Sequence, residues 1–215
     1  MKSLPDGVAR PAATAAASLV LFCGLAAAVA GGAAEPVDIV LRDAAHGRAS
    51  PSVTAFMAAI THLGSAAVIA PLAVATWAIF ATSRRGRAAW HLAWIMAGSV
   101  VLENGLKLAF HRMRPEPFFG LAAPETYSFP SGHALFSGCF YGAIASMLAA
   151  GAGGRFSRIA IWTMATGLVA AIGSSRIYLG MHYPSDVLGG LLAAAFWLAA
   201  VRGFAIWRRP DLAPR

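Results

Sequence analysis

Six long apolar runs, separated by short polar or basic segments, dominate this sequence. A helix needs about 20 consecutive apolar residues to cross a bilayer, and its backbone polar groups must be satisfied within the chain. The composition agrees, because 58% of the residues are hydrophobic and 12% are charged, whereas a soluble domain carries about 25% charged residues. We therefore predict an all-α fold. It is an integral membrane bundle of six transmembrane helices that forms a single domain over 1–215, with spans at about 12–32, 54–81, 88–109, 132–150, 158–175 and 185–207.

The distribution of lysine and arginine predicts the orientation of this bundle. Cytoplasmic loops of membrane proteins carry an excess of these residues. Eleven of the 17 basic residues lie in the amino terminus, the 83–87 loop, the 151–158 turn and the carboxyl tail: Lys2, Arg10, Arg84, Arg85, Arg87, Arg155, Arg158, Arg202, Arg208, Arg209 and Arg215. The other side holds Arg42, Arg48, Lys107, Arg112, Arg114 and Arg176. We therefore expect both termini to be cytoplasmic.

The first apolar run leaves one alternative open. Lys2 and Arg10 precede an alanine-rich stretch that ends Ala-Val-Ala-Gly-Gly-Ala, a pattern that also fits a cleavable secretory signal. Cleavage would leave five spans and put the two termini on opposite sides of the membrane. The run is long for a signal core, so we favour a retained first helix.

Three polar clusters interrupt the apolar pattern, at 107–115, 130–133 and 175–186. Ionisable side chains next to hydrocarbon are costly, so their presence there indicates a functional site. In the predicted topology, the third span ends, the fourth span begins and the fifth-to-sixth connection lies on the non-cytoplasmic side. All three clusters therefore fall on one face, an agreement that the charge count did not require. We place the active site at this face.

The first cluster contains two cations with a useful spacing. Lys107 and Arg114 are seven residues apart, or about two helical turns, so both can point to one side. A lysine point charge and an arginine donor fork together suit the oxygens of a phosphate. The alternative is that both cations extend to the headgroup region, and we assign His111 and Arg112 to that alternative. Glu103, four residues before Lys107, is expected to hold the lysine in place or to contact substrate.

The second cluster opens the fourth span. Ser131 and Gly132 would present a hydroxyl and free backbone N–H groups at a helix amino terminus, which is a natural anion site. An ordinary helix cap is the alternative for the serine. His133 serves no capping purpose, and an unperturbed imidazole titrates near neutral pH, which favours a catalytic interpretation.

The third cluster pairs a histidine with an acid. His182 and Asp186 are four residues apart, so on a helix they share a face. The carboxylate can then accept a hydrogen bond from one imidazole nitrogen and leave the other free as a nucleophile or base. Arg176 lies six residues earlier and can reach the same anion. A purely structural His–Asp pair is the alternative.

Other site types fit the sequence less well. The converging groups are mainly cations, which would repel a metal ion, so we predict no metal and no cofactor. The basic residues lie in short connections without interleaved aromatic residues, which argues against nucleic-acid binding. His46, His62 and His91 lie outside the clusters and are assigned structural roles.

The order and spacing of the clusters resemble the signature of a known family. Lys-x6-Arg-Pro, Pro-Ser-Gly-His and Ser-Arg-x5-His-x3-Asp are similar to the three motifs of the type 2 phosphatidic acid phosphatase superfamily. Its members include membrane lipid phosphatases, glucose-6-phosphatases and soluble vanadium haloperoxidases. The match covers residues 107–186, and such a tripartite pattern is very specific. The first hundred residues contribute predicted transmembrane spans but no motif of the family.

The resemblance implies a role for each matching residue. His182 would be the nucleophile that forms a phosphohistidine, and Asp186 would orient it. His133 would protonate the departing oxygen and afterwards help to activate water. Phosphate binding would fall to Lys107, Arg114, Ser131, Gly132 and Arg176. Members of the family work without a metal.

We therefore expect a metal-independent membrane phosphatase that acts on a lipid phosphate or pyrophosphate. Candidate substrates are undecaprenyl pyrophosphate, phosphatidylglycerol phosphate, phosphatidic acid and lipid A phosphate. The expected partners are this substrate and the bilayer. The expected location is a bacterial inner (plasma) membrane, with the site facing the periplasm or exterior. The 116–128 loop is expected to cover the site and select the headgroup.

Two alternatives remain for the function. A lipid phosphotransferase could use the same site with another acceptor. A catalytically inactive transport or scaffolding protein would be expected to have lost His182, His133 or Arg176, and all three are present.

Overall fold

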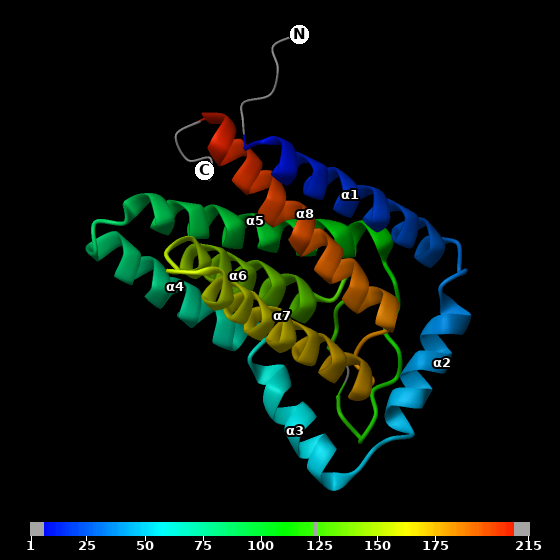
Figure 1. The fold of residues 1–215 in the computed structure, drawn as a ribbon. Coiled ribbons are helices and arrows are strands. Elements are labelled where there is room, and N and C mark those ends of the chain that lie inside the picture. Colours follow the sequence, from blue (N-terminus) through cyan, green and yellow to red (C-terminus); the bar gives the residue numbers. More distant parts are fainter. Residues whose placement is uncertain (1–6, 123, 209–215) are drawn as a thin grey trace.

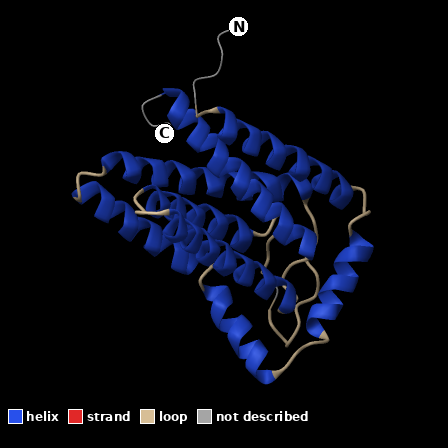
Figure 2. Cartoon of the chain, viewed as in Figure 1, coloured by secondary structure: helices blue, strands red, loops and turns tan. Residues whose placement is uncertain are grey.

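The computed structural model describes residues 7–122 and 124–208. Regular structure within these ranges consists of eight α-helices and no strand (Figures 1 and 2). The helices are α1 (Ala9–Ala30), α2 (Glu35–His46), α3 (Pro51–His62), α4 (Ala66–Thr82), α5 (Gly86–Phe110), α6 (Gly132–Ala150), α7 (Arg155–Tyr178) and α8 (Pro184–Arg208).

The predicted all-α membrane bundle is confirmed. Among the described residues, five helices are long and apolar enough to cross a bilayer: α1, α5, α6, α7 and α8. The α3–α4 pair supplies a sixth span if it is taken as one bent unit. α6 lies between α5, α7 and α8 and contributes much of the core, while α1 packs along α8 (Figure 1).

The segment 54–81, predicted as one uninterrupted span, is broken. α3 ends at His62, α4 begins at Ala66, and the two helices differ in direction by 44°. At Gly64 a Cβ atom would come within 2.4 Å of the Ile172 side chain, so the close approach of α7 requires a glycine in the break. Ser65 then has extended backbone (φ −73°, ψ 148°), which ends the helical path. Average hydropathy does not register this break, because the residues around it remain largely apolar.

The polar connection before residue 51 contains a helix that the sequence interpretation did not include. α2 is amphipathic: Val37 and Val40 are 60% and 66% exposed, whereas Asp38 is 2% exposed. Its buried side contacts α7 and α8. Figure 1 shows α2 and α3 at one end of the bundle, on either side of the loop that joins α5 to α6.

The basic connections and the polar clusters lie toward opposite ends of the bundle. The α4–α5 and α6–α7 connections lie away from α2 and α3, as do the first turn of α1 and the last turn of α8 (Figure 1). The end that carries α2 also holds the carboxyl end of α7 and the amino end of α8. The separation of basic connections from polar clusters, predicted from the order of the spans, is therefore present in the fold.

Candidate active site

Residues from all three polar clusters meet at this end of the bundle. The backbone N–H of Ser131 donates to the carbonyl oxygen of Asp186 at 2.9 Å, which joins the second cluster to the third. Nη1 of Arg114 lies 3.0 Å from Nε2 of His182, which joins the first cluster to the third. Residues far apart in the sequence thus form one buried polar centre.

The hydrogen bond to Arg114 determines which nitrogen of His182 carries the proton. A guanidinium only donates, so Nε2 of His182 must accept with its lone pair. The proton of the neutral imidazole is then on Nδ1, which lies 3.5 Å from Oδ2 of Asp186 and 3.4 Å from Oγ of Ser128. His182 is 2% exposed. Burial lowers the pKa of His182 to about 4, although Asp186 acts to raise it. The imidazole is therefore neutral at pH 7.

Asp186 is held by several donors at the start of α8. Its Oδ2 accepts from the Ser128 hydroxyl at 2.5 Å and from the Tyr183 backbone N–H at 2.9 Å. Its Oδ1 accepts from Nη1 of Arg112 at 2.6 Å. The stretch from His182 to Asp186 is not helical throughout, because α8 begins at Pro184. The side chain of Asp186 instead closes the turn that enters α8 and faces His182.

Arg176 and Ser131 bring unpaired donors into the centre. Nη1 of Arg176 donates to Oγ1 of Thr61 at 2.9 Å, which ties α7 to α3. Among the described residues, Nε of Arg176 and Oγ of Ser131 are buried without a hydrogen-bond partner. A buried polar group without a partner is costly. These two atoms are therefore suited to an anion. Ser131 precedes α6, but its hydroxyl makes no capping bond, contrary to the helix-cap alternative.

Glu103 and Lys107 form an ion pair beside the amino end of α6. Nζ of Lys107 lies 2.5 Å from Oε1 of Glu103, the contact expected from their spacing. A Cβ atom on Gly132 would come within 2.9 Å of the same carboxylate oxygen. The absence of a side chain at Gly132 thus allows Glu103 to lie against the first turn of α6, where negative charge is favourable.

Arg114 is fixed by the loop between α5 and α6 and does not extend to the headgroup region. Its Nε donates to the carbonyl oxygen of Thr126 at 2.7 Å, and its Nη2 donates to Oγ1 of Thr126 at 2.9 Å. Nη1 also donates to the carbonyl oxygen of Met181 at 2.9 Å. Thr126 was not singled out from the sequence, because loop–arginine contacts across twelve residues follow no periodic pattern.

The assignment of Arg112 to the headgroup region is wrong. Its Nη1 donates to Asp186 at 2.6 Å, and its Nη2 donates to Oδ2 of Asp38 at 2.8 Å. Burial acts to lower the pKa of Arg112, but the charges and hydrogen bonds of Asp186 and Asp38 raise it above its ordinary value. No periodic spacing in the sequence joins Asp38 to Arg112. The one available signal was an acid among the apolar residues 37–41.

The 116–128 loop packs against the turn between α7 and α8 that carries His182. The backbone N–H of Phe118 donates to the carbonyl oxygen of Leu179 at 3.0 Å. Gly180 has φ +74°, and a Cβ atom there would come within 2.6 Å of the Phe118 nitrogen, so this contact requires glycine. His46 stacks on the Phe118 ring with centroids 3.8 Å apart, which agrees with a structural role.

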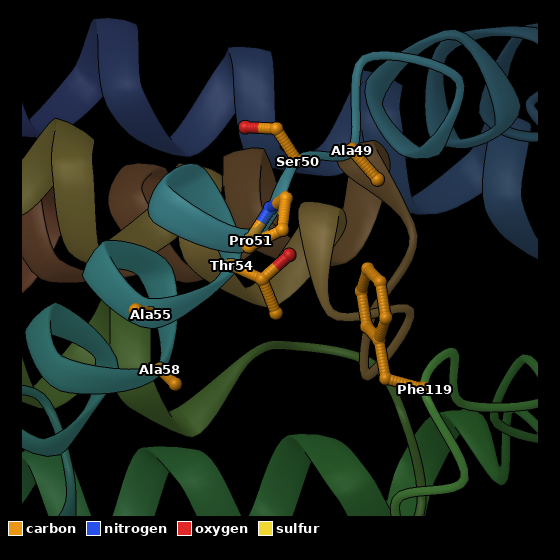
Figure 3. Close-up of a pocket in the computed structure, with 7 residues that line it drawn as sticks. All are labelled: Ala49, Ser50, Pro51, Thr54, Ala55, Ala58 and Phe119. Carbon is orange, nitrogen blue, oxygen red and sulfur yellow. The ribbon is translucent and has the colours of Figure 1, made fainter.

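A shallow groove of about 570 Å³ lies beside this loop (Figure 3). Phe119 forms one side and α3 forms the other, and the remaining lining residues are Ala49, Ser50, Pro51, Thr54, Ala55 and Ala58. The Phe119 ring stacks on Tyr178, whose hydroxyl lies 2.7 Å from Oγ1 of Thr54. The lining of the groove does not include the residues of the polar centre.

Comparison with known proteins identifies the family. Residues 88–210, which contain all three motifs, match the PAP2 superfamily. The chain belongs to the PAP2 superfamily. It is 31% identical over 186 residues to phosphatidylglycerophosphatase B of Bacillus subtilis (strain 168), covering 86% of this chain and 91% of the relative.

Two further similarities agree with membership of the PAP2 superfamily. The crystal structure of a transmembrane PAP2 type phosphatidylglycerolphosphate phosphatase from Bacillus subtilis superposes with a TM-score of 0.81 at 29% identity, covering 89% of this chain and 96% of that one. A lipid A 1-phosphatase of Rhizobium etli is 36% identical over 135 residues, 54% of this chain and 53% of the relative. The protein is therefore an integral membrane enzyme, a lipid phosphatase of the PAP2 superfamily.

Proposed function

We propose that this enzyme hydrolyses the terminal phosphate of a lipid phosphate or pyrophosphate without a metal, through a phosphohistidine at His182. The observation that carries the proposal is the lone pair of Nε2, which accepts from Arg114 while Nδ1–H faces Asp186. A bound phosphate would take the place of the imidazole as the acceptor for Arg114. The lone pair would then be free to attack phosphorus, in the tautomer that nucleophilic catalysis requires.

The reaction would proceed in two displacements. Nε2 of His182 forms a bond to phosphorus while the bond to the leaving oxygen breaks, and His133 gives that oxygen a proton. His133, now neutral, removes a proton from water, whose oxygen attacks the phosphohistidine and releases phosphate. Asp186 stabilises the positive charge that the imidazole gains when the P–N bond forms. The position of His133 in the first turn of α6 supports this role.

The phosphate oxygens would be held by cations and by the start of α6. Lys107, Arg114 and Arg176 supply charge, and Ser131 supplies a hydroxyl. The first N–H groups of a helix lack intrahelical partners, so those of Gly132 and its neighbour can bind the same oxygens. Phosphoryl transfer depends on stabilising charge on the equatorial oxygens. Cations can do this work in place of a metal ion.

The names of the relatives support an order of priority within the panel of candidate substrates. The Bacillus subtilis relative is named a phosphatidylglycerophosphatase, which supports phosphatidylglycerol phosphate as the first candidate. The Rhizobium etli relative is named a lipid A 1-phosphatase, and it makes lipid A phosphate the second candidate. Phosphatidic acid and undecaprenyl pyrophosphate complete the panel.

We also propose that the site faces the periplasm or exterior of a bacterial inner membrane, with both termini cytoplasmic and 1–215 as one membrane domain. The excess of lysine and arginine in the connections remote from the site supports this orientation.

The test measures phosphate release from each lipid of this panel by the detergent-purified enzyme with a chelator present. The His182→Ala variant is measured in parallel. We expect release by the wild type and a loss of at least about a thousandfold in the variant. Equal release by both proteins would contradict the nucleophile assignment. Loss of wild-type activity in chelator, restored by a divalent cation, would contradict metal independence. Release only when an acceptor lipid is added would indicate a phosphotransferase.

A further inference from the structure

Asp38 connects α2 to the polar centre although it lies outside the three motifs. It is 2% exposed. Its Oδ1 accepts from the Ser185 backbone N–H at 2.8 Å, and its Oδ2 accepts from the Ser185 hydroxyl at 2.5 Å. Oδ2 also accepts from Nη2 of Arg112 at 2.8 Å. The carboxylate thus binds both the entry to α8 and the cation that reaches Asp186.

Arg112 bridges two buried carboxylates. One nitrogen of its guanidinium contacts Asp38 and the other contacts Asp186, at 2.8 and 2.6 Å. Cζ of the guanidinium lies over the Tyr183 ring, 4.3 Å from its centroid. A planar fork that is stacked and bonded on both sides has little freedom. Asp38 therefore fixes the position of Arg112, and Arg112 fixes one oxygen of Asp186.

The four groups alternate in charge as phosphoryl transfer begins. Asp38 is negative, Arg112 positive and Asp186 negative, and His182 becomes positive when its Nε2 bonds phosphorus. Without Asp38, the full charge of Arg112 would be directed at Asp186 alone. Less of the Asp186 charge would then remain to stabilise the imidazolium, and such interactions are strong in a buried site.

We propose that Asp38 is a positioning residue for catalysis, which acts through Arg112 to hold Asp186 in place and keep its negative charge available to His182. The proposal rests on the function proposed above, in which His182 attacks phosphorus. A purely structural role, in which Asp38 only attaches α2 to α8, predicts different kinetics.

The test compares Asp38→Asn with Asp43→Asn, which makes the same change on the same helix at a carboxylate that is 61% exposed. Steady-state kinetics use the best substrate of the wild type. We expect Asp38→Asn to lower kcat by about tenfold to a hundredfold, the usual cost of losing an outer hydrogen-bond partner, with KM within about twofold. Asp43→Asn should match the wild type.

Two more readouts separate positioning from attachment. Because Asp38 acts through Arg112, Asp38→Asn combined with Arg112→Gln should be no slower than Arg112→Gln alone, whereas independent roles multiply. In Asp38→Asn, the acid limb of the pH profile of kcat/KM should also not move to higher pH than in the wild type. The titratable and charged groups that interact with His182 include Asp186, Arg114, Arg176 and His133. A loosened site that admits water would move the limb toward the ordinary histidine value of about 6.5.

Each contradicting result is distinct from a failure of the proposed function. Activity of Asp38→Asn equal to that of Asp43→Asn would overturn the positioning role while the wild type and His182→Ala still differed. The positioning role would also be overturned if the losses in kcat of Asp38→Asn and Arg112→Gln multiplied in the double variant. A raised KM in Asp38→Asn, or an acid limb of its kcat/KM profile at higher pH than in the wild type, would overturn it as well. Should Asp38→Asn not fold, Arg112→Lys tests the same bridge, because one ammonium cannot hold both carboxylates as the fork does. Wild-type kcat in that variant would contradict the proposal.

Discussion

Nη1 of Arg114 lies 3.0 Å from Nε2 of His182, while Nε and Nη2 of the same guanidinium are bound by Thr126. The arginine is therefore fixed before substrate arrives, with one nitrogen directed at the proposed nucleophile. Fixed donors stabilise developing charge without reorganisation.

Arg114→Lys should lower kcat by about a hundredfold, because a single ammonium cannot reproduce this fork. Phosphate release by the purified variant is the measurement. Arg48→Lys is the control, since Arg48 is exposed in the connection between α2 and α3. If the lysine variant keeps the wild-type kcat, charge alone suffices at residue 114 and the fixed geometry is unimportant.

The pH profile should reflect the environment of His182. Burial lowers its pKa to about 4, so the imidazole of this proposed nucleophile stays neutral down to that pH. The acid limb of kcat/KM should therefore lie near pH 4, below the ordinary histidine value of about 6.5. If the acid limb instead lies at about pH 6 to 7 and disappears when another residue is substituted, the limb reports the titration of that residue and not of His182.

The lowered pKa of His182 also affects the stability of the folded protein. The unfolded chain binds a proton at His182 below about pH 6.5, whereas the folded chain resists it until about pH 4. The contribution of His182 to stability is therefore present above pH 6.5 and is lost as the pH falls toward 4. Thermal unfolding in detergent should show a smaller loss between pH 7 and 4.5 for His182→Gln than for the wild type. An identical loss would contradict the burial of a neutral imidazole.

Gly132→Ala should disturb the Glu103–Lys107 ion pair next to the proposed phosphate site. The added Cβ would come within 2.9 Å of Oε1 of Glu103, the oxygen that binds Lys107, so the end of the Glu103 side chain must shift. This oxygen is the far end of a flexible side chain, so the fold should tolerate the change, but we expect kcat/KM to fall at least about tenfold because the carboxylate that binds Lys107 is displaced. Gly167→Ala is the matched control, because a Cβ there meets no atom within 4 Å. Equal activity of the two variants would show that this contact is tolerant.

Thr61→Val removes the partner that holds Arg176. Nη1 of Arg176 donates to Oγ1 of Thr61 at 2.9 Å, and a hydrogen bond to a charged group contributes about 1.5–3 kcal/mol. We expect KM to rise about tenfold with a smaller change in kcat. Thr76→Val is the control, since the Thr76 hydroxyl bonds only the preceding turn of its own helix. An unchanged KM would mean that Arg176 keeps its position without α3.

Local spacing explains which contacts could be predicted. Glu103 and Lys107 are one helical turn apart, so their ion pair follows from periodicity. The apolar runs likewise predict spanning helices, since the length that crosses a bilayer is a property of each segment. These features depend on residues close in sequence.

Contacts between distant segments could not be predicted in this way. The bond from Asp38 to Arg112 joins residues 74 positions apart and depends on where α2 packs. Without that information, Arg112 had the pattern of a cation at a membrane surface. The break after His62 was hidden for a related reason, because the need for glycine at residue 64 arises from the approach of α7.

In the proposed reaction, His182 carries the phosphoryl group between the two displacements. The most direct measurement is rapid quenching of the wild type with a lipid substrate labelled in its terminal phosphate, followed by mapping of the label by mass spectrometry. We expect an acid-labile, base-stable phosphate on the peptide that contains His182, and no label in His182→Ala. Label on a different residue, or turnover at the full rate with no trapped phosphoenzyme, would contradict it.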